Sequence, residues 1–134
     1  MNDRYHDMGY LIARIFLAAV FLYSGAIKAT DWSGSLTEVT ALALPLPELS
    51  LALTIIVQIA GGIALISGRY IILAAGALAV FTVFATLLAH DFWNYSELQQ
   101  QRQLTTALEH LAIIGGFILI ALSGPGRYRL GGKA

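Results

Sequence analysis

The sequence predicts an all-α integral membrane protein, an antiparallel four-helix bundle with both termini in the cytoplasm. Composition is the first observation behind this prediction: hydrophobic residues make up 57% of the chain and charged residues only 12%. A soluble domain carries roughly 25% charge. The second observation is that four segments approach the roughly 20 apolar residues needed to cross a bilayer. The 134 residues therefore form a single transmembrane domain, 1–134.

The predicted spans are residues 10–27, 49–68, 70–90 and 104–123. The second and third contain no Asp, Glu, Lys or Arg. The first contains Arg14, which lies about one turn from the start of the span and is expected to snorkel to the inner interface as an anchor. The last contains Glu109, which needs a partner inside the bundle.

Basic residues orient the predicted bundle. Because Lys and Arg concentrate in cytoplasmic loops, the side with six of them is expected to be cytoplasmic and the side with two to be outer. The first group is Arg4, Arg14, Arg69, Arg127, Arg129 and Lys133, and the second is Lys28 and Arg102.

The two outer loops carry further structural signals. The segment 35–38 is typical of a capping box and predicts a short interfacial helix. Pro47 and Glu48 suit the first turn of the second span. A second capping box, 96–99, predicts that the last helix begins in water. The aromatic residues expected at the headgroup level are Phe92, Trp93 and Tyr95.

Small residues are expected where helices touch, because close backbone contact holds helices together in lipid. The same faces would also suit a homo-oligomer, although packing within the chain is preferred. In the second span these small residues are Ala60, Ala64 and Gly68, with Gly61 and Gly62 beside them. In the third span they are Ala75 and Ala79, and in the fourth they are Ala112, Gly115 and Gly116.

Polar side chains of all four spans lie in the outer half, at i, i+4 spacings that place each set on one helix face. An ionised carboxylate in hydrocarbon costs roughly 2.5–3.5 kcal/mol. We therefore expect Glu109 to face inward and either to pair or to be protonated, with Lys28 as the first choice of partner and His90 as the other candidate. The candidate pocket residues are Lys28, Gln58, His90, Glu109 and His110, together with Ser24, Thr54, Thr82 and Thr86.

This polar set has two main interpretations. It is either a purely structural hydrogen-bond network or a site for a small molecule such as a quinone head. Haem held by His90 and His110 is a disfavoured third interpretation, since two imidazoles without further matching spacing are a weak signal. The chain has no cysteine, so disulfides and thiolate metal sites are excluded and no metal site is expected. It has no net charge, so nucleic acid is not an expected partner.

Four short motifs occur in the order of the spans. They are Ala13-Arg14-Ile15 with Ser24-Gly25-x-x-Lys28; Leu44-Pro45-Leu46-Pro47 with Gln58-x-x-Gly61-Gly62 and Ser67-Gly68; His90-Asp91-Phe92-Trp93; and Gly115-Gly116-Phe117 with Ser123-Gly124-Pro125-Gly126-Arg127-Tyr128. In this order and spacing, over about residues 9–130, the chain resembles the DoxX family.

The resemblance implies a four-helix protein of the bacterial inner membrane. DoxX-type relatives are subunits of quinol oxidase or thiosulfate:quinone oxidoreductase systems, or membrane partners of redox enzymes. This chain departs from the family pattern twice: it has Gln58 where a Glu is expected, and Glu109-His110 where a Lys-Asn pair is common. A role of the family's helix-two carboxylate is therefore not carried over to Gln58.

The leading functional hypothesis is an accessory, quinone-linked membrane subunit that offers its outer polar pocket to a quinone head or to a redox-enzyme partner. Its redox part rests on the resemblance alone. No catalytic constellation is visible, so any enzymatic activity would be that of a larger quinone-linked oxidoreductase. The alternatives are a small-molecule or lipid transporter and a structural membrane interaction module.

Overall fold

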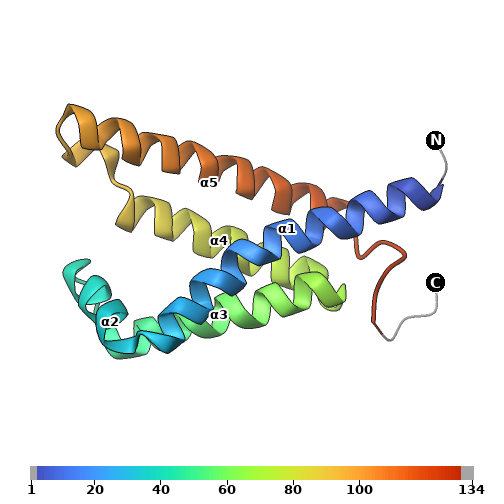
Figure 1. Ribbon diagram of the computed structural model, residues 1–134, viewed down its shortest axis with the longest axis horizontal. Coiled ribbons are helices and arrows are strands. Elements are labelled where there is room, and N and C mark those ends of the chain that lie inside the picture. The colour runs from blue at the N-terminus through green and yellow to red at the C-terminus, as the bar shows by residue number, and fades with distance from the viewer. Residues whose placement is uncertain (1–2, 131–134) are drawn as a thin grey trace.

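The computed structural model describes residues 3–130, and within them it contains helices and no strand. Four helices are long and apolar enough to cross a membrane. A short helix and a single 3-10 turn lie in the two longer connections (Figure 1). In chain order the elements are α1 (Asp3–Thr30), α2 (Trp32–Ala41), α3 (Pro47–Ser67), α4 (Ile71–Ala89), η1 (Phe92–Asn94) and α5 (Glu97–Ser123).

Helix ends follow the sequence signals with two corrections. Pro47 opens α3 and Glu48 lies in its first turn, as predicted. Ser96 occupies the N-cap position of α5, but its side chain makes no capping hydrogen bond, so the capping box predicted at 96–99 is not formed. The short helix α2, however, is capped by Asp31, whose carboxylate accepts from the Gly34 amide at 3.1 Å. The capping box expected at Ser35 is therefore wrong, because an earlier cap starts the helix and leaves Ser35 buried inside it.

The first and last long helices extend beyond their predicted spans. Helix α1 has 28 residues and α5 has 27, which correspond to about 42 Å and 40 Å at the α-helical rise. The hydrocarbon core is only about 30 Å thick. Each helix is therefore longer than a span along the membrane normal requires.

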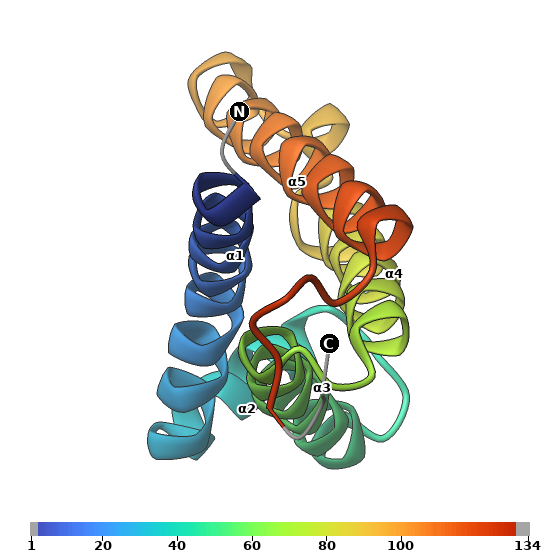
Figure 2. The same cartoon turned by 90° about the vertical axis from the view of Figure 1, so that its right-hand side faces the viewer.

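The long helices are arranged as two pairs. Helix α1 packs along α3, α4 packs along α5, and the pairs meet through α3 and α4, whereas α1 and α5 touch little (Figures 1 and 2). We call the end with the start of α1, the α3–α4 turn and the segment after α5 the turn end. The opposite end, with α2 and η1, is the loop end. The pairs converge at the turn end and diverge at the loop end (Figure 1).

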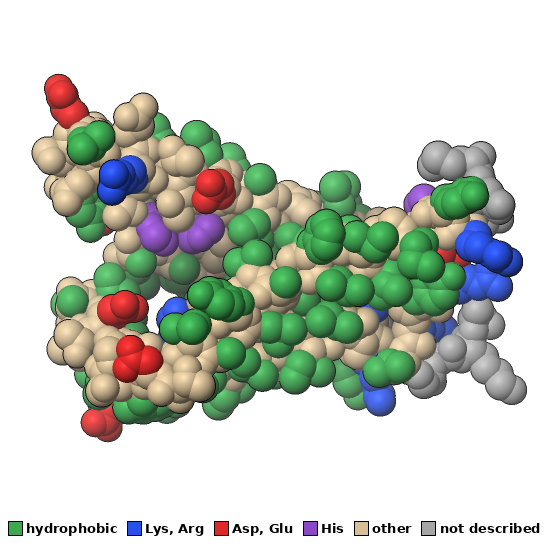
Figure 3. All heavy atoms as spheres, in the orientation of Figure 1, with side chains coloured by type: hydrophobic (Ala, Val, Ile, Leu, Met, Phe, Trp, Pro, Cys, Tyr) green, Lys and Arg blue, Asp and Glu red, His purple; other side chains and the backbone are tan. Residues whose placement is uncertain are grey.

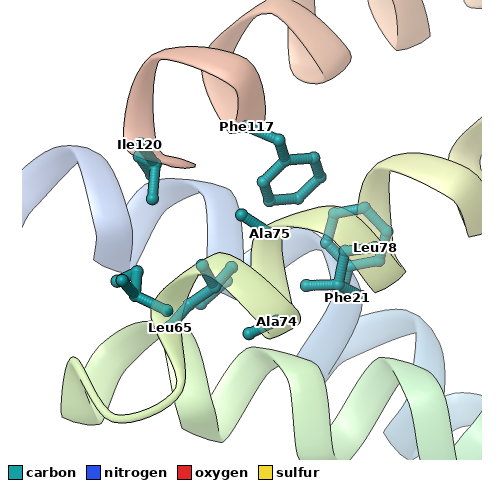
Figure 4. Packing of buried hydrophobic residues seen from close by; sticks show 9 residues of the cluster. Phe21, Leu65, Ala74, Ala75, Leu78, Phe117 and Ile120 are labelled. Atoms are coloured by element: carbon teal, nitrogen blue, oxygen red, sulfur yellow. The ribbon is translucent and has the colours of Figure 1, made fainter. Parts of the chain in front are cut away.

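The buried apolar core lies toward the turn end and draws on all four long helices (Figure 4). Phe21 of α1 contacts Phe117 of α5, with ring centroids 5.4 Å apart. Leu65 of α3 and Leu78 of α4 are fully buried beside them. The remaining core residues are Ala18, Ile71, Ala74, Ala75 and Ile120.

The guanidinium of Arg14 is completely buried at this end. Its Nε donates to the Leu65 carbonyl at 2.7 Å and its Nη2 to the Ile66 carbonyl at 2.5 Å, both in the last turn of α3. Its Nη1 donates to the carbonyls of Pro125 and Tyr128, each at 2.7 Å, in the segment after α5. The snorkelling arginine predicted from the sequence is therefore wrong: backbone carbonyls, and not headgroups or water, solvate this cation.

Further hydrogen bonds join the same helices and the segment after α5 at the turn end. The Tyr10 hydroxyl is hydrogen-bonded to the carbonyls of Ile120 and Gly124, and the Leu130 amide donates to the Ser67 carbonyl at 2.8 Å. Gly68 ends α3 in the left-handed region, at φ 71°. A Cβ there would lie 2.9 Å from Arg14 Nη2, so glycine serves both the turn and the space that the guanidinium needs.

Close helix contacts are made at fewer small residues than predicted. A Cβ on Gly61 would lie 2.8 Å from Cγ of Leu78, and one on Gly62 would lie 2.7 Å from Cγ of Leu22, so these glycines set the approach of α3 to α4 and to α1. Gly116 likewise approaches Leu17 of α1. The packing role predicted for Ala60, Ala112 and Gly115 is not found, because the two alanines are exposed and a Cβ on Gly115 would meet nothing within 4 Å.

We predict that Gly61→Ala and Gly62→Ala each lower the stability of the protein by about 1–3 kcal/mol, because a methyl group there overpacks a helix contact. The matched control is Gly76→Ala, where a Cβ would meet nothing within 4 Å. It should be neutral or stabilise by up to about 1 kcal/mol through helix propensity. Reversible unfolding in detergent micelles measures all three. Equal stabilities for Gly62→Ala and Gly76→Ala would contradict the packing.

Candidate functional site

A cavity of about 590 Å³ lies where the two helix pairs diverge, and we call it the loop-end cavity. The space-filling view shows the molecule hollowed between the two pairs at this end, with histidine side chains on one wall (Figure 3). Residues of α1, α2, α3, α4 and α5 all line it.

Aromatic rings separate the cavity from the turn end. Phe21 and Phe81 both line it, with ring centroids 6.3 Å apart in an edge-to-face arrangement. Phe21 also contacts the buried ring of Phe117. The floor of the cavity is therefore apolar and aromatic, while hydrogen-bonding groups lie on the walls.

The wall formed by α1 and α3 carries a short chain of polar contacts. Lys28 Nζ donates to Ser24 Oγ at 2.9 Å, and Gln58 Nε2 donates to the same oxygen at 3.1 Å. Gln58 is only 4% exposed. Its carbonyl oxygen, Oε1, is buried and has no hydrogen-bond partner among the described residues. Buried polar atoms normally have partners, so this acceptor marks a place where a ligand or water can bind.

The wall formed by α4 and α5 carries a second polar chain. The Thr86 hydroxyl donates to the Thr82 carbonyl at 2.7 Å and lies 2.8 Å from His110 Nδ1. His90 Nδ1 lies 2.7 Å from Gln103 Oε1. The imidazole rings of His90 and His110 touch edge to face, with centroids 5.0 Å apart.

These partners fix the tautomer that each ring has in its neutral form. The amide oxygen of Gln103 can only accept, so His90 Nδ1 must carry a proton. The single hydroxyl proton of Thr86 is already donated to a backbone carbonyl, so Thr86 must accept from His110 Nδ1. In the neutral form of each ring the lone pair is therefore on Nε2, and the described residues provide neither Nε2 with a partner.

Most of the predicted pocket residues come together here. Lys28, Gln58, His90 and His110 line the loop-end cavity, and so do Ser24, Thr54 and Thr82. Thr86 lies behind His110 as its hydrogen-bond partner. Their placement is established, whereas their role in binding stays a prediction.

Glu109 is the exception. Its side chain is exposed and it does not line the cavity. Both predicted partners of Glu109 are wrong, because Lys28 is bonded to Ser24 of its own helix and His90 is bonded to Gln103. Successive residues on an α-helix point about 100° apart. Since His110 faces α4, its neighbour Glu109 is turned away from the bundle.

Sequence reasoning missed three parts of the site. Gln103, which fixes the His90 tautomer, lies seven residues before His110 and therefore on the same helix face; this spacing could have revealed it. Glu38 of α2 also lines the cavity, but no pattern in the sequence predicts that α2 folds back over it. The aromatic floor of Phe21 and Phe81 could not be told from ordinary core.

Comparison with known proteins identifies the family. The DoxX family model matches residues 9–91. The chain belongs to the DoxX family. The matched segment begins inside α1 and ends just after α4, so it includes Lys28, Gln58 and His90. Helix α5, which carries His110, lies beyond it.

Two relatives of this DoxX protein are inner membrane proteins of Escherichia coli strain K12. Inner membrane protein YqjF is 32% identical over 124 residues, which cover 92% of this chain and 90% of the relative. Inner membrane protein YphA is 24% identical over 133 residues, covering 95% of each. No solved structure matches the chain.

Proposed function

We propose that this DoxX-family inner-membrane protein is an accessory subunit of a quinone-linked redox system, and that the loop-end cavity binds the quinone head. The observation that carries the proposal is the partnerless acceptor of Gln58, buried in a cavity between membrane-spanning helices. The redox assignment comes from the resemblance of the motifs to the DoxX family.

A quinone head matches the chemistry of this cavity. The head is a flat ring with oxygen atoms at opposite edges, and the cavity offers aromatic surface from Phe21 and Phe81 with hydrogen-bonding groups on both walls. Its volume of about 590 Å³ lies within the range of small-molecule sites, about 300–1,000 Å³. A lipid-soluble ligand would also reach a site between transmembrane helices directly from the bilayer.

The proposal includes an orientation: an antiparallel bundle with both termini in the cytoplasm and the loop end facing the periplasm. Basic side chains support it, since most of them lie at the turn end (Figure 3), and Lys and Arg favour the cytoplasmic side. Lys133, which was counted with them in the sequence, lies outside the described residues.

We predict that a cysteine replacing Asn94 in η1 reacts with a membrane-impermeant maleimide in cells with a permeabilised outer membrane. A cysteine replacing Leu130 at the turn end should react only after lysis, because it would face the cytoplasm. The chain has no cysteine of its own, so background labelling is absent. The reverse pattern of labelling would overturn the orientation.

Binding itself is tested by titrating the purified protein with a short-chain ubiquinone analogue and following thermal unfolding. We expect ligand at 100 times its dissociation constant to stabilise the protein by about 2.7 kcal/mol. Gln58→Leu should weaken binding about tenfold, since a hydrogen bond to a ligand contributes about 1 kcal/mol or more.

The matched control is Glu109→Gln, which alters a polar residue of the same depth range outside the cavity and should leave binding unchanged. No stabilisation of the wild-type protein by the analogue would refute quinone binding. Equal losses in Gln58→Leu and Glu109→Gln would place the ligand elsewhere.

A further inference from the structure

We infer that the loop-end cavity prefers the reduced, dihydroxy form of the quinone, the quinol, over the oxidised form. This inference rests on the proposed function and adds the redox state of the ligand. It follows from the balance of hydrogen-bond donors and acceptors that the walls leave free.

Besides the exposed carboxylate of Glu38, three acceptors around the cavity lack partners among the described residues. One is Gln58 Oε1, which is buried. The others are the Nε2 atoms of His90 and His110, because Nδ1 of each ring carries the proton and is bonded to Gln103 or Thr86. They lie on both walls: Gln58 on α3, and the two histidines beside α4 and on α5.

Free donors are also present, but on one wall. The Lys28 ammonium has three N–H groups and gives one to Ser24. The Thr54 hydroxyl lines the same wall. An oxidised quinone has only carbonyl oxygens, so it can accept from Lys28 or Thr54 but can offer nothing to the three acceptors.

A quinol satisfies both sets. Each of its hydroxyl groups can accept from Lys28 or Thr54 and also donate to Gln58 or a histidine. A buried acceptor left without a partner weakens binding, and the most deeply buried of the three is Gln58. We expect the quinol to bind about tenfold more tightly than the quinone, a difference of about 1.4 kcal/mol.

The experiment compares a quinol and a quinone with the same short tail, titrated anaerobically into the full chain in lipid nanodiscs. We expect a dissociation constant about tenfold lower for the quinol. The midpoint potential of the bound two-electron couple should then lie about 30 mV above that of the free couple. Binding of neither form would refute the proposed function together with this inference. Equal binding of both forms would refute the inference and leave the proposed function standing.

Thr86→Val tests the tautomer argument separately from the ligand contact. It removes the acceptor that holds His110 Nδ1–H, so the ring is free to present an N–H to the cavity. The ratio of the quinone dissociation constant to the quinol dissociation constant should then fall toward one. The matched control is Thr105→Val on α5. Thr105 makes the same backbone contact one turn back, to Gln101 at 2.9 Å, but is exposed and does not line the cavity.

Nitrogen-15 NMR of labelled histidine gives a readout independent of binding. In the wild-type protein at a pH where both rings are neutral, Nε2 of His90 and His110 should show the chemical shift of an unprotonated nitrogen. Thr86→Val should change the His110 signal and Thr105→Val should not. A protonated Nε2 in the wild type, or an unchanged quinol preference in Thr86→Val, would overturn the inference.

Discussion

The bond pattern of Arg14 is the constraint on which the shape of the molecule depends. A buried cation requires compensation for the water it has lost, and this one receives it from the carbonyls of Leu65, Ile66, Pro125 and Tyr128. The last turn of a helix has carbonyls without intrahelical partners and a partial negative charge. One guanidinium thus satisfies the end of α3, holds the segment after α5 and fixes both to α1.

Because the two helix pairs are held together at the turn end, they can separate at the loop end. The apolar core and the Arg14 contacts lie toward the turn end, and the hydrophobic effect does little to press helices together in lipid. At the loop end the helix pairs separate around polar side chains, which form hydrogen bonds within each wall instead of closing the gap. The cavity is therefore a consequence of where the packing residues and the polar residues lie along the helices.

Much of this fold could be predicted from the sequence, because the signals are local. Hydropathy gives the four long helices, and Pro47 and Gly68 mark the ends of α3. The grouping of polar residues toward one end could also be predicted, since i, i+4 spacing fixes which side chains share a helix face.

What escaped prediction depends on helix rotation and on distant contacts. A rotation of one residue, about 100°, decides that His110 faces the cavity and Glu109 does not. Likewise, whether Arg14 reaches headgroups or carbonyls depends on a chain segment more than 100 residues away, Pro125 to Tyr128. The predicted ion pair of Glu109 failed for the first reason, and the snorkelling of Arg14 for the second.

The role of Arg14 is tested most directly by the distance between spin labels on cysteines replacing Ile12 of α1 and Leu122 of α5, both of which are exposed. Double electron–electron resonance in nanodiscs should give a narrow distance distribution in the wild-type background. With Arg14→Leu the distribution should be broad. With Arg14→Lys, which keeps the charge but loses the guanidinium fork, it should have an intermediate width. Arg69→Leu, which replaces an exposed arginine at the same end, should leave the distribution unchanged. A distribution in Arg14→Leu as narrow as in the wild type would contradict the account.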